Sequence, residues 1–362
     1  MVILDVALNH IYGFDHFHVY FSYPRKLSVD LIGEENLQGR ERFRYKKAVI
    51  LMGANAAGKT SLGKALFKIF SSIQEANEAF LRELGGANVP AEFQVDFVNE
   101  GFTLHRYCGV IEGENVSIRY YSSDIGESDS YEMSAAKLQE HTDQLAGNFK
   151  KLKSIVGPLE FRFAYPEIES SLRIKEIKKA ELLRTLRAVI GTLDPTLTDV
   201  SIAKDLKDSF VIRRRGEEII IQEGKLLNRD VLSSGTVEGI DVAVFLASML
   251  SGGNSFYYCD EHFSYIQSDI EKRIFTLMVE RLGANEQLIF TTHNTDMLDL
   301  NLPKHAFAFL RKEVDDGVFK VSVTFASDVL KRNTDSVKCA LENDVFRSLP
   351  DDSLLDELEV EA

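Results

Sequence analysis

Short apolar runs and helical patterns alternate near the two ends of the chain. Apolar residues fill 49–52, 256–259 and 288–290, and each run is bounded by small or polar residues. Apolar positions recur at helical spacing over 62–69, after the first run, and a helical pattern spans 270–282 between the other two. Runs of this length predict buried strands and the spacing between them predicts helices, so we expect an α/β fold.

The segment after the first predicted helix follows a different pattern. Apolar and polar residues alternate over 91–123, and turn residues occur at 99–101 and 113–115. Alternation interrupted by such turns predicts an antiparallel meander of strands.

Helical patterns return in the middle of the chain, at 135–154 and 174–192. A further pair of strands is predicted within 208–224, with a turn at Gly216. Neither helical pattern sustains a heptad repeat over many turns, which excludes a long coiled coil.

Length and cysteine content restrict the class of protein. The chain has 362 residues, enough for one large α/β domain or two modest ones. No apolar stretch approaches the ~18 residues that a membrane span needs, so no membrane partner is expected. Cys108, Cys259 and Cys339 are far apart and show no paired spacing, which argues against a disulfide framework or a zinc knuckle. Since the first residues do not resemble a signal peptide, we expect a cytoplasmic protein.

The net charge is −14, and much of the excess is local. Residues 342–362 carry eight acidic side chains against Arg347 alone, which leaves the rest of the chain near −7. We expect this acidic C-terminal tail to be a solvated end, with a docking segment as the alternative. Basic clusters occur at 40–46, 150–153 and 213–215. Each is most simply a solvated face, and direct contact with nucleic acid is the alternative that they leave open.

The most specific motif follows the first apolar run. Residues 53–60 have the pattern Gly-x-x-x-x-Gly-Lys-Thr between a predicted strand and a predicted helix, which is the context of a P-loop. The glycines would let backbone N–H groups wrap a phosphate, Lys59 would neutralise the β- and γ-phosphates, and the Thr60 hydroxyl would hold Mg²⁺. The motif predicts a nucleotide site rather than a glycine-rich turn alone. Tyr12 or Phe14 is a candidate for stacking on adenine, with a core aromatic as the alternative.

A carboxylate pair closes the second apolar run. Asp260 lies at the predicted strand end, where it would bind Mg²⁺ through water, and Glu261 would polarise the attacking water as a general base. The alternative is an acidic pair that merely ends a strand. His293 follows the third run, about 30 residues later, where its ring would contact a γ-phosphate. A structural histidine is the alternative there.

Four small residues, 233–236, precede a predicted apolar helix. Ser, Thr and Gly are good N-caps, so an extended cap is the simple interpretation. The alternative is half of an anion site, because the free N–H groups of a helix N-terminus attract phosphate.

The order of these motifs resembles that of ABC-type ATPases. In that family a signature, usually LSGGQ, lies between the P-loop and the carboxylate strand, and residues 232–236 are LSSGT. The alternating residues around Gly13 and Phe14 look like the strand pair that opens the SMC and RecF branch. More narrowly, LSSGT, Asp-Glu without a following Pro-Thr, and IFTTHNTDMLD are similar to the stand-alone ATPases of the abortive-infection and overcoming-lysogenization-defect group, which are usually linked to bacterial phage defence.

The resemblance implies a fold and its subdivisions. The implied fold is an α/β P-loop NTPase of ABC type, with a mixed central sheet, an antiparallel β-lobe and a helical lobe. We expect residues 1–362 to form one ATPase domain. Within it, the β-lobe is expected at 1–50 and 90–123, and the helical lobe, with a returning hairpin, at 130–230.

The resemblance also implies a shared site. In ABC-type dimers two chains pack head to tail, and each signature faces the P-loop of the partner. ATP and Mg²⁺ are the implied ligands, with Glu261, His293 and Lys59 as catalytic residues and Thr60 and Asp260 as metal ligands. The implied nucleotide-binding residues of the two halves are Gly53, Asn55, Gly58, Lys59, Thr60 and Ser61, together with Ser233, Ser234 and Gly235.

Two features depart from the family pattern. Many ABC proteins continue the carboxylate strand as DEPTSALD, whereas residues 260–267 are DEHFSYIQ, so the loop that couples the two sites of a dimer is unusual. The glutamine that usually contacts Mg²⁺ is not assigned. Gln94 lies in a predicted strand, and Gln139 and Gln144 lie in a helical pattern.

The expected function is that of a sensor or regulatory ATPase in bacterial anti-phage defence. It would form a homodimer or higher homo-oligomer through ATP and control a separate effector, a nuclease or a toxin, because the sequence shows no effector chemistry of its own. The alternative is a RecF-like ATPase that binds DNA in recombination or repair. A transporter subunit fits less well, because of the large insert between the P-loop and the signature.

Overall fold

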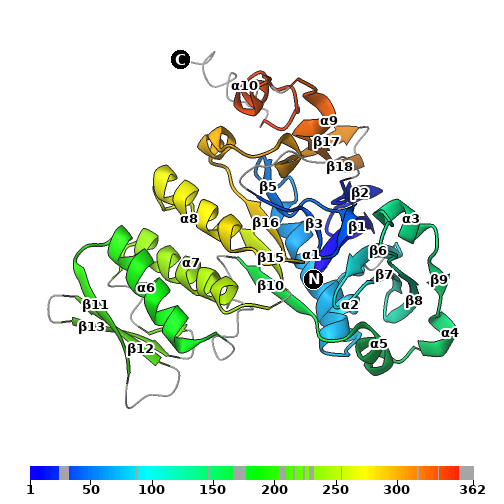
Figure 1. The fold of residues 1–362 in the computed structure, drawn as a ribbon, viewed down its shortest axis with the longest axis horizontal. Coiled ribbons are helices and arrows are strands. Elements are labelled where there is room, and N and C mark those ends of the chain that lie inside the picture. Colours follow the sequence, from blue (N-terminus) through cyan, green and yellow to red (C-terminus); the bar gives the residue numbers. More distant parts are fainter. Residues whose placement is uncertain are drawn as a thin grey trace.

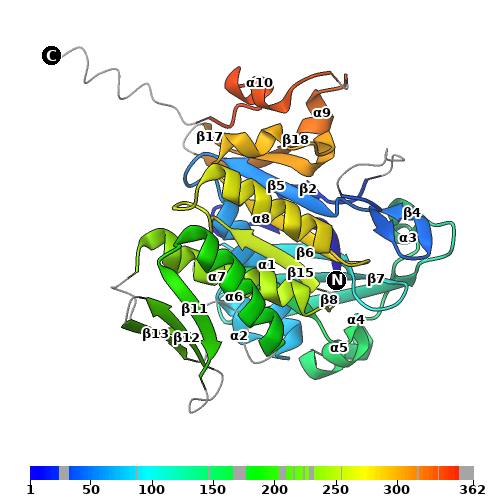
Figure 2. The same cartoon turned by 60° about the vertical axis from the view of Figure 1, so that its left-hand side comes forward.

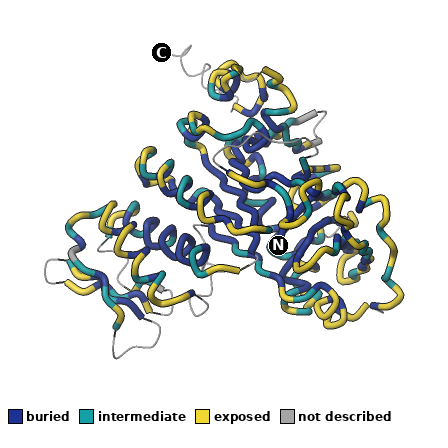
Figure 3. Tube along the Cα trace, viewed as in Figure 1, coloured by how far each residue is buried: buried dark blue, intermediate teal, exposed yellow. Residues whose placement is uncertain are grey.

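A computed structural model shows how these elements assemble (Figure 1). It describes residues 1–23, 32–86, 89–145, 147–165, 177–203, 209–214, 217–222, 225–227, 232–253, 255–315, 318–332 and 334–349. Within these residues the strands form two six-stranded sheets, a four-stranded sheet and a two-stranded ribbon. The strands at the centre of the molecule are mostly buried, whereas exposed positions gather on the outlying helices and turns (Figure 3).

The central sheet is mixed, in the order β10-β15-β16-β5-β17-β18. Its first five strands are parallel, and β18 is antiparallel to β17. The predicted strands at 49–52, 256–259 and 288–290 are confirmed as β5, β15 and β16, each one residue longer at both ends. The strands are β5 (Ala48–Gly53), β10 (Glu160–Ala164), β15 (Ser255–Asp260), β16 (Gln287–Thr291), β17 (Phe307–Asp315) and β18 (Val318–Phe325).

Both faces of the central sheet are buried. In β5, Val49 and Leu51 belong to one hydrophobic cluster, and Ile50 and Met52 belong to the other. A parallel sheet that is covered on both faces has no solvated side, so its strands are apolar throughout instead of alternating. This explains why the strands appear in the sequence as continuous apolar runs.

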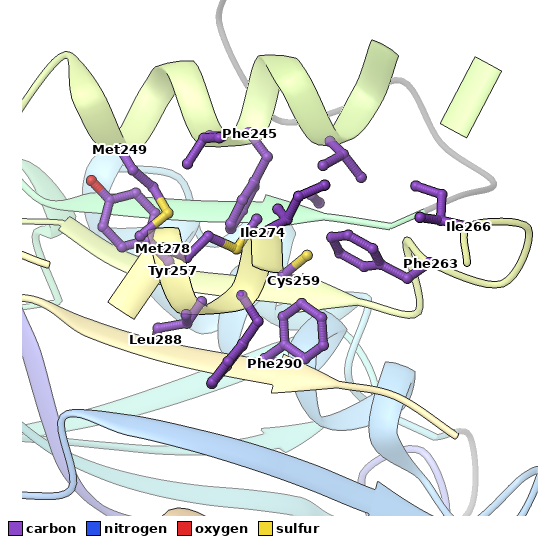
Figure 4. Packing of buried hydrophobic residues seen from close by; sticks show 14 of the residues in the cluster. Phe245, Met249, Tyr257, Cys259, Phe263, Ile266, Ile274, Met278, Leu288 and Phe290 are labelled. Atoms are coloured by element: carbon purple, nitrogen blue, oxygen red, sulfur yellow. The ribbon is translucent and has the colours of Figure 1, made fainter. Parts of the chain in front are cut away.

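Helices cover the two faces (Figures 1 and 2). α1 (Lys59–Gln74) lies on the face of Val49, and α7 (Ser234–Leu250) and α8 (Ser268–Arg281) lie on the opposite face. Figure 4 shows the second face, where Phe245 of α7 packs over the side chains of β15 and β16.

The second large sheet is antiparallel, in the order β2-β1-β6-β7-β8-β9. Its strands are β1 (Val2–Asn9), β2 (Phe17–Tyr20), β6 (Ala91–Val98), β7 (Thr103–Glu112), β8 (Asn115–Asp124) and β9 (Gln139–Glu140). Both predicted turns of the meander are present, and Gly101 and Gly113 adopt the positive φ values, 73° and 59°, that glycine tolerates best. The N-terminal strand pair and the meander therefore form one sheet.

Residues 1–50, expected within the β-lobe, are divided among several sheets. β3 (Asn36–Leu37) and β4 (Arg40–Arg44) form a separate ribbon, and β5 belongs to the central sheet. The basic cluster here is not one solvated face, because Lys46 is only 5% exposed and donates a hydrogen bond to the Tyr20 carbonyl at 2.5 Å.

The helix predicted at 135–154 is replaced by three short helices. They are α3 (Tyr131–Ala135), α4 (Thr142–Leu145) and α5 (Phe149–Val156), and β9 lies between the first two. The side chains of Ser130 and Asn148 accept backbone hydrogen bonds at the starts of α3 and α5. Ser130 starts α3 ahead of the predicted range, and Asn148 starts a new helix inside it, where the periodicity alone predicted a continuous one.

A lobe to one side of the central sheet contains α6 (Lys179–Leu193) and a four-stranded antiparallel sheet (Figures 1 and 2). α6 lies against α7. The strands of this sheet are β11 (Leu197–Ile202), β12 (Ser209–Arg214), β13 (Glu217–Gln222) and β14 (Lys225–Leu226). β12 and β13 correspond to the predicted strand pair, and the turn at Gly216 lies outside the described residues. β10, also within 130–230, pairs with β15 in the central sheet.

The remaining elements are short, and several lie near the C-terminus. They are α2 (Ala79–Arg82), the 3-10 helices η3 (Thr295–Asp299) and η4 (Lys304–Ala306), α9 (Ala326–Val329) and α10 (Val337–Glu342). Of the expected acidic tail, residues 350–362 lie outside the described residues. In the part of the chain that the structure covers, no helix is long and apolar enough to span a bilayer.

Candidate nucleotide-binding site

The loop between β5 and α1 follows a path that requires glycine at two positions. A Cβ at Gly53 would lie 2.6 Å from the carbonyl oxygen of Leu310, and one at Gly58 would lie 3.1 Å from the ring of Phe14. Gly58 also has a φ of +112° and occupies the N-cap position of α1. The loop therefore leads directly to the free N–H groups of a helix N-terminus, which favour anions.

Lys59, the first residue of α1, is 3% exposed. Its ammonium group donates to the carbonyl oxygens of Gly53 at 2.8 Å and Ala54 at 3.2 Å, and it lies 3.2 Å from Glu261 Oε1. Burial lowers the pKa of Lys59, and the charge of Glu261 opposes this shift. The Tyr258 hydroxyl donates to the Lys59 carbonyl at 2.6 Å and so joins the start of α1 to β15.

Asp260 ends β15 and is 1% exposed. Its Oδ1 accepts a hydrogen bond from Thr291 Oγ1 at 2.7 Å. Burial raises the pKa of this carboxyl group, and hydrogen bonds from Thr60 and Thr291 lower it. Its Oδ2 is buried and has no hydrogen-bond partner among the residues that the structure describes.

The residues at Asp260 fit a magnesium ion. Buried polar atoms are nearly always hydrogen-bonded, so the unpartnered Oδ2 is consistent with a water-coordinated cation next to Thr60. No group of three or more potential metal ligands occurs among the described residues. Mg²⁺ at phosphate sites is usually held by one or two protein ligands plus phosphate oxygens, so it needs no such group.

Glu261 and His293 lie in contact just after the ends of β15 and β16. Glu261 Oε1 lies 3.0 Å from His293 Nε2, and the Glu261 N–H donates to Thr291 Oγ1 at 3.0 Å. The hydrogen bond from His293 and the charge of Lys59 lower the pKa of Glu261 to about 2, against the effect of burial. Glu261 is therefore ionised at all ordinary pH values. A carboxylate with so low a pKa is a weak base while both partners remain in place.

A second glutamate holds the His293 loop. Glu271 of α8 is 2% exposed, and it accepts hydrogen bonds from Thr292 Oγ1 at 2.7 Å and from Asn294 Nδ2 at 2.6 Å. These two residues flank His293. The sequence offered only a weak sign of this role, namely an acidic residue inside an amphipathic helical pattern.

Two adjoining hollows surround the P-loop. The first, of about 360 Å³, is lined by residues 55–61, which include Asn55 and Ser61, and by Glu261 and Lys312. Tyr12 and Phe14 line it as well, but Tyr12 is 40% exposed whereas Phe14 is fully buried. Tyr12 is thus the accessible one of the two candidate aromatics.

The second hollow, of about 560 Å³, extends from the P-loop past His293. Its lining includes Arg311 and Lys312 of β17 and Arg347, and it shares Lys312 with the first hollow. Lys312 was not identified from the sequence, because it lies in a strand whose sequence contains no recognisable motif.

The predicted signature residues lie elsewhere. Ser233 caps α7, and its Oγ accepts the N–H of Thr236 at 3.2 Å. Ser233 and Ser234 are exposed, and a Cβ at Gly235 would lie 2.7 Å from the carbonyl oxygen of Tyr265. Ser233, Ser234 and Gly235 are not among the described residues that line either hollow. One chain therefore brings Lys59, Asp260, Glu261 and His293 together, but not the signature residues.

The three glutamines considered from the sequence are also separate from the site. Gln94 lies in β6, Gln139 in β9 and Gln144 in α4. The described lining of the two hollows includes none of them.

Comparison with known proteins identifies the fold. No family model and no curated protein matches the chain. An SMC head bound to the C-terminal winged-helix domain of ScpA is similar, with a TM-score of 0.53 and 15% identity over 91% of this chain and 100% of that chain. An Smc head with an extended coiled coil from Pyrococcus furiosus, bound to the C-terminal domain of ScpA, has a TM-score of 0.51 and 13% identity over 91% and 98% of the chains. RecF, a recombination mediator, has a TM-score of 0.44 and 11% identity over 88% and 97% of the chains.

The two SMC heads match nearly the whole of this chain, and at this level of identity the match concerns the fold. Together with the P-loop between β5 and α1, it shows that the chain has an α/β P-loop fold of ABC type, with a mixed central sheet and an antiparallel β-lobe.

Proposed function

We propose that the chain is an ABC-type ATPase that binds and hydrolyses ATP with Mg²⁺ and acts as a homodimer. The observation that carries this proposal is the convergence of three groups at the P-loop. Glu261 lies 3.2 Å from Lys59 and 3.0 Å from His293. A cation, a carboxylate and an imidazole beside a phosphate-binding loop are suited to phosphoryl transfer to water.

Each residue has a separate task in this mechanism. Lys59 binds the terminal phosphates. These phosphates compete with Glu261 for the ammonium group of Lys59 and so weaken the contact between the two side chains. Loss of that partner raises the pKa of Glu261 from about 2 towards its ordinary range, so Glu261 becomes a better base for a nearby water. Thr60 and Asp260 would hold Mg²⁺, which neutralises phosphate charge when bound. His293, 44% exposed, keeps Glu261 oriented and contacts the γ-phosphate.

The signature residues of a second copy would complete the site. Ser233 and Ser234 are exposed at the N-terminus of α7, apart from the hollows around their own P-loop. Small residues allow a backbone to approach a phosphate closely, and Ser233 to Gly235 fit that need. The signature residues of one copy would contact the γ-phosphate bound by the other copy. Because these contacts exist only while the γ-phosphate is present, the head-to-tail dimer would close on ATP and open after hydrolysis.

The biological role that we propose is that of a sensor or regulatory subunit in anti-phage defence, controlling a separate nuclease or toxin. The motif resemblance supports this role, and a similar SMC head binds a domain of another protein, ScpA. A RecF-like ATPase that binds DNA is the second candidate. It is favoured by three exposed lysines on α5, Lys150, Lys151 and Lys153.

Two measurements test these proposals. Sedimentation should show a dimer in the presence of Mg²⁺ and a non-hydrolysable ATP analogue and a monomer without them. Identical profiles would contradict the shared site. Purification of native complexes with and without ATP should recover an effector protein. Strong stimulation of the ATPase by DNA, with no protein partner recovered, would instead support the second candidate.

A further inference from the structure

The loop that follows β15 is fixed by its own side chains. Glu261 at its start belongs to the nucleotide site. Phe263 and Ile266 are 6% and 8% exposed, and both point into the hydrophobic cluster beneath α7 (Figure 4). His262 is 3% exposed. Three of the five residues from 262 to 266 are therefore buried, which restricts the motion of the loop.

Glu238 joins this loop to α7. Its two carboxylate oxygens accept the backbone N–H groups of Ser264 at 3.0 Å and of Tyr265 at 2.8 Å. The Glu238 side chain is only 8% exposed, so these bonds are shielded from water. One helical turn earlier, Gly235 lies so close to the Tyr265 carbonyl that a Cβ would be 2.7 Å from it. The loop and residues 233–236, here called the signature turn, therefore form one unit.

The side chain of Tyr265 is turned to solvent from this fixed backbone. It is 70% exposed, more than any other large hydrophobic residue in the described part of the chain. Ser233 and Ser234 on the adjoining turn are exposed as well. Tyrosine is enriched among the residues that dominate interface energies, and a backbone that is already rigid loses little entropy on binding.

We propose that Tyr265 is an aromatic anchor of the surface that binds a second copy of this chain, and that Glu238 is the residue that positions it. The proposal rests on the head-to-tail dimer proposed above. The loop begins at Glu261, in one nucleotide site, and packs on Gly235, in the turn that serves the site of the other copy. A partner that covers both features must cover Tyr265 between them.

The test is the dissociation constant of the dimer, measured by sedimentation equilibrium of the full chain with Mg²⁺ and a non-hydrolysable ATP analogue. Tyr265→Ala should raise it by at least about tenfold, because hot-spot truncations commonly have effects of that size or larger. Tyr265→Phe should stay close to wild type. Tyr20→Ala, which removes a 50% exposed tyrosine from the antiparallel sheet, is the matched control and should have no effect.

Glu238→Gln gives an independent measurement. An amide has a single acceptor oxygen, so one of the two backbone hydrogen bonds is lost. The dimer should weaken in this variant too, while the affinity of the monomer for a fluorescent ATP analogue should not change. Thermal unfolding reports whether the Glu238→Gln variant folds. If it does not fold, the Tyr265 variants still test the proposal.

The outcomes separate this proposal from the one on which it rests. If Ser233→Arg abolishes the dimer and Tyr265→Ala leaves its dissociation constant unchanged, the shared site stands and the anchor is wrong. If Tyr265→Ala weakens ATP binding by the monomer, the residue acts within its own site, and the anchor is again wrong. If the wild type does not associate with the analogue, both proposals fail.

Discussion

The P-loop and the signature turn differ in charge and in burial. At the P-loop, a buried lysine and a carboxylate lie 3.2 Å apart, and His293 lies 3.0 Å from the same carboxylate. At the signature turn, Ser233 and Ser234 are exposed and uncharged, and Ser233 caps its own helix. The first region is preorganised within one chain. The second has a helix N-terminus and little steric bulk, and under the proposed head-to-tail arrangement its anionic ligand would be brought by a second copy of the chain.

Removal of the buried cation should have the largest effect. Lys59→Ala should weaken ATP binding by about a hundredfold, because truncating one partner of a buried, hydrogen-bonded charge pair between protein and ligand costs about 3 kcal/mol. Titration calorimetry measures this directly. Lys64→Ala, on the same helix but partly exposed, should bind ATP nearly as the wild type does. Equal affinities for the Lys59 and Lys64 variants would remove the P-loop from the proposed site.

Glu261→Gln should separate binding from hydrolysis. The amide keeps the size of the side chain but cannot accept the proton of a water molecule, so the turnover rate should fall by about a hundredfold or more. ATP binding should persist, and the closed dimer should accumulate. Glu280→Gln, on the exposed side of α8, is the control for a lost carboxylate. Hydrolysis by the Glu261 variant at the wild-type rate would show that the general-base assignment is wrong.

Ser233→Arg tests the other region. A long cation at the signature turn should block association driven by ATP, because no backbone could then approach the phosphates of a second copy. Loss of the N-cap should cost the monomer only about 1 kcal/mol. Ser233→Thr keeps a capping hydroxyl and should retain association. Sedimentation with and without an ATP analogue distinguishes the two variants, and dimerisation of the arginine variant would contradict the head-to-tail arrangement.

His262, in the loop between the two regions, should give the smallest effect. Within the described part of the chain its two ring nitrogens have no hydrogen-bond partner, and burial lowers its pKa from 6.5 to about 4. Between those values the unfolded chain binds the extra proton, so the contribution of His262 to stability is complete above pH 6.5 and declines as the pH falls towards 4.

A comparison with His262→Leu isolates this contribution. Between pH 7 and pH 5.5 the wild type should lose about 1 kcal/mol of unfolding free energy relative to the leucine variant. Denaturant titrations at several pH values measure the difference. His16→Leu, at a histidine whose side chain is 80% exposed, should show no such trend. A difference that is independent of pH would mean that His262 is not buried in its neutral form.

Local sequence was sufficient for much of the fold. The strands β5, β15 and β16 and the P-loop before α1 were predicted within one residue, because short apolar runs and the glycine pattern are determined by nearby residues. The prediction failed at 135–154, where the end of α3 at Ala135, the pairing of β9 with β8 and the N-cap Asn148 broke a helical pattern. The spacing of apolar residues carries no information about competing N-caps or strand pairing.

The tertiary structure alone decided which predicted residues meet. Lys59, Glu261 and His293 converge because β5, β16 and β15 are parallel neighbours, and the carboxyl ends of parallel strands lie at one edge of the sheet. The roles of Glu271 and Glu238 are equally a matter of tertiary structure, since each accepts hydrogen bonds from a loop 20 or more residues away. By itself, the sequence determined that the chain has a P-loop and a run of small residues before α7. Only the packed structure decided that Glu261 and His293 lie beside the P-loop whereas the small residues before α7 lie apart from it. The physical reason is that side-chain contacts between distant segments depend on the arrangement of the whole sheet.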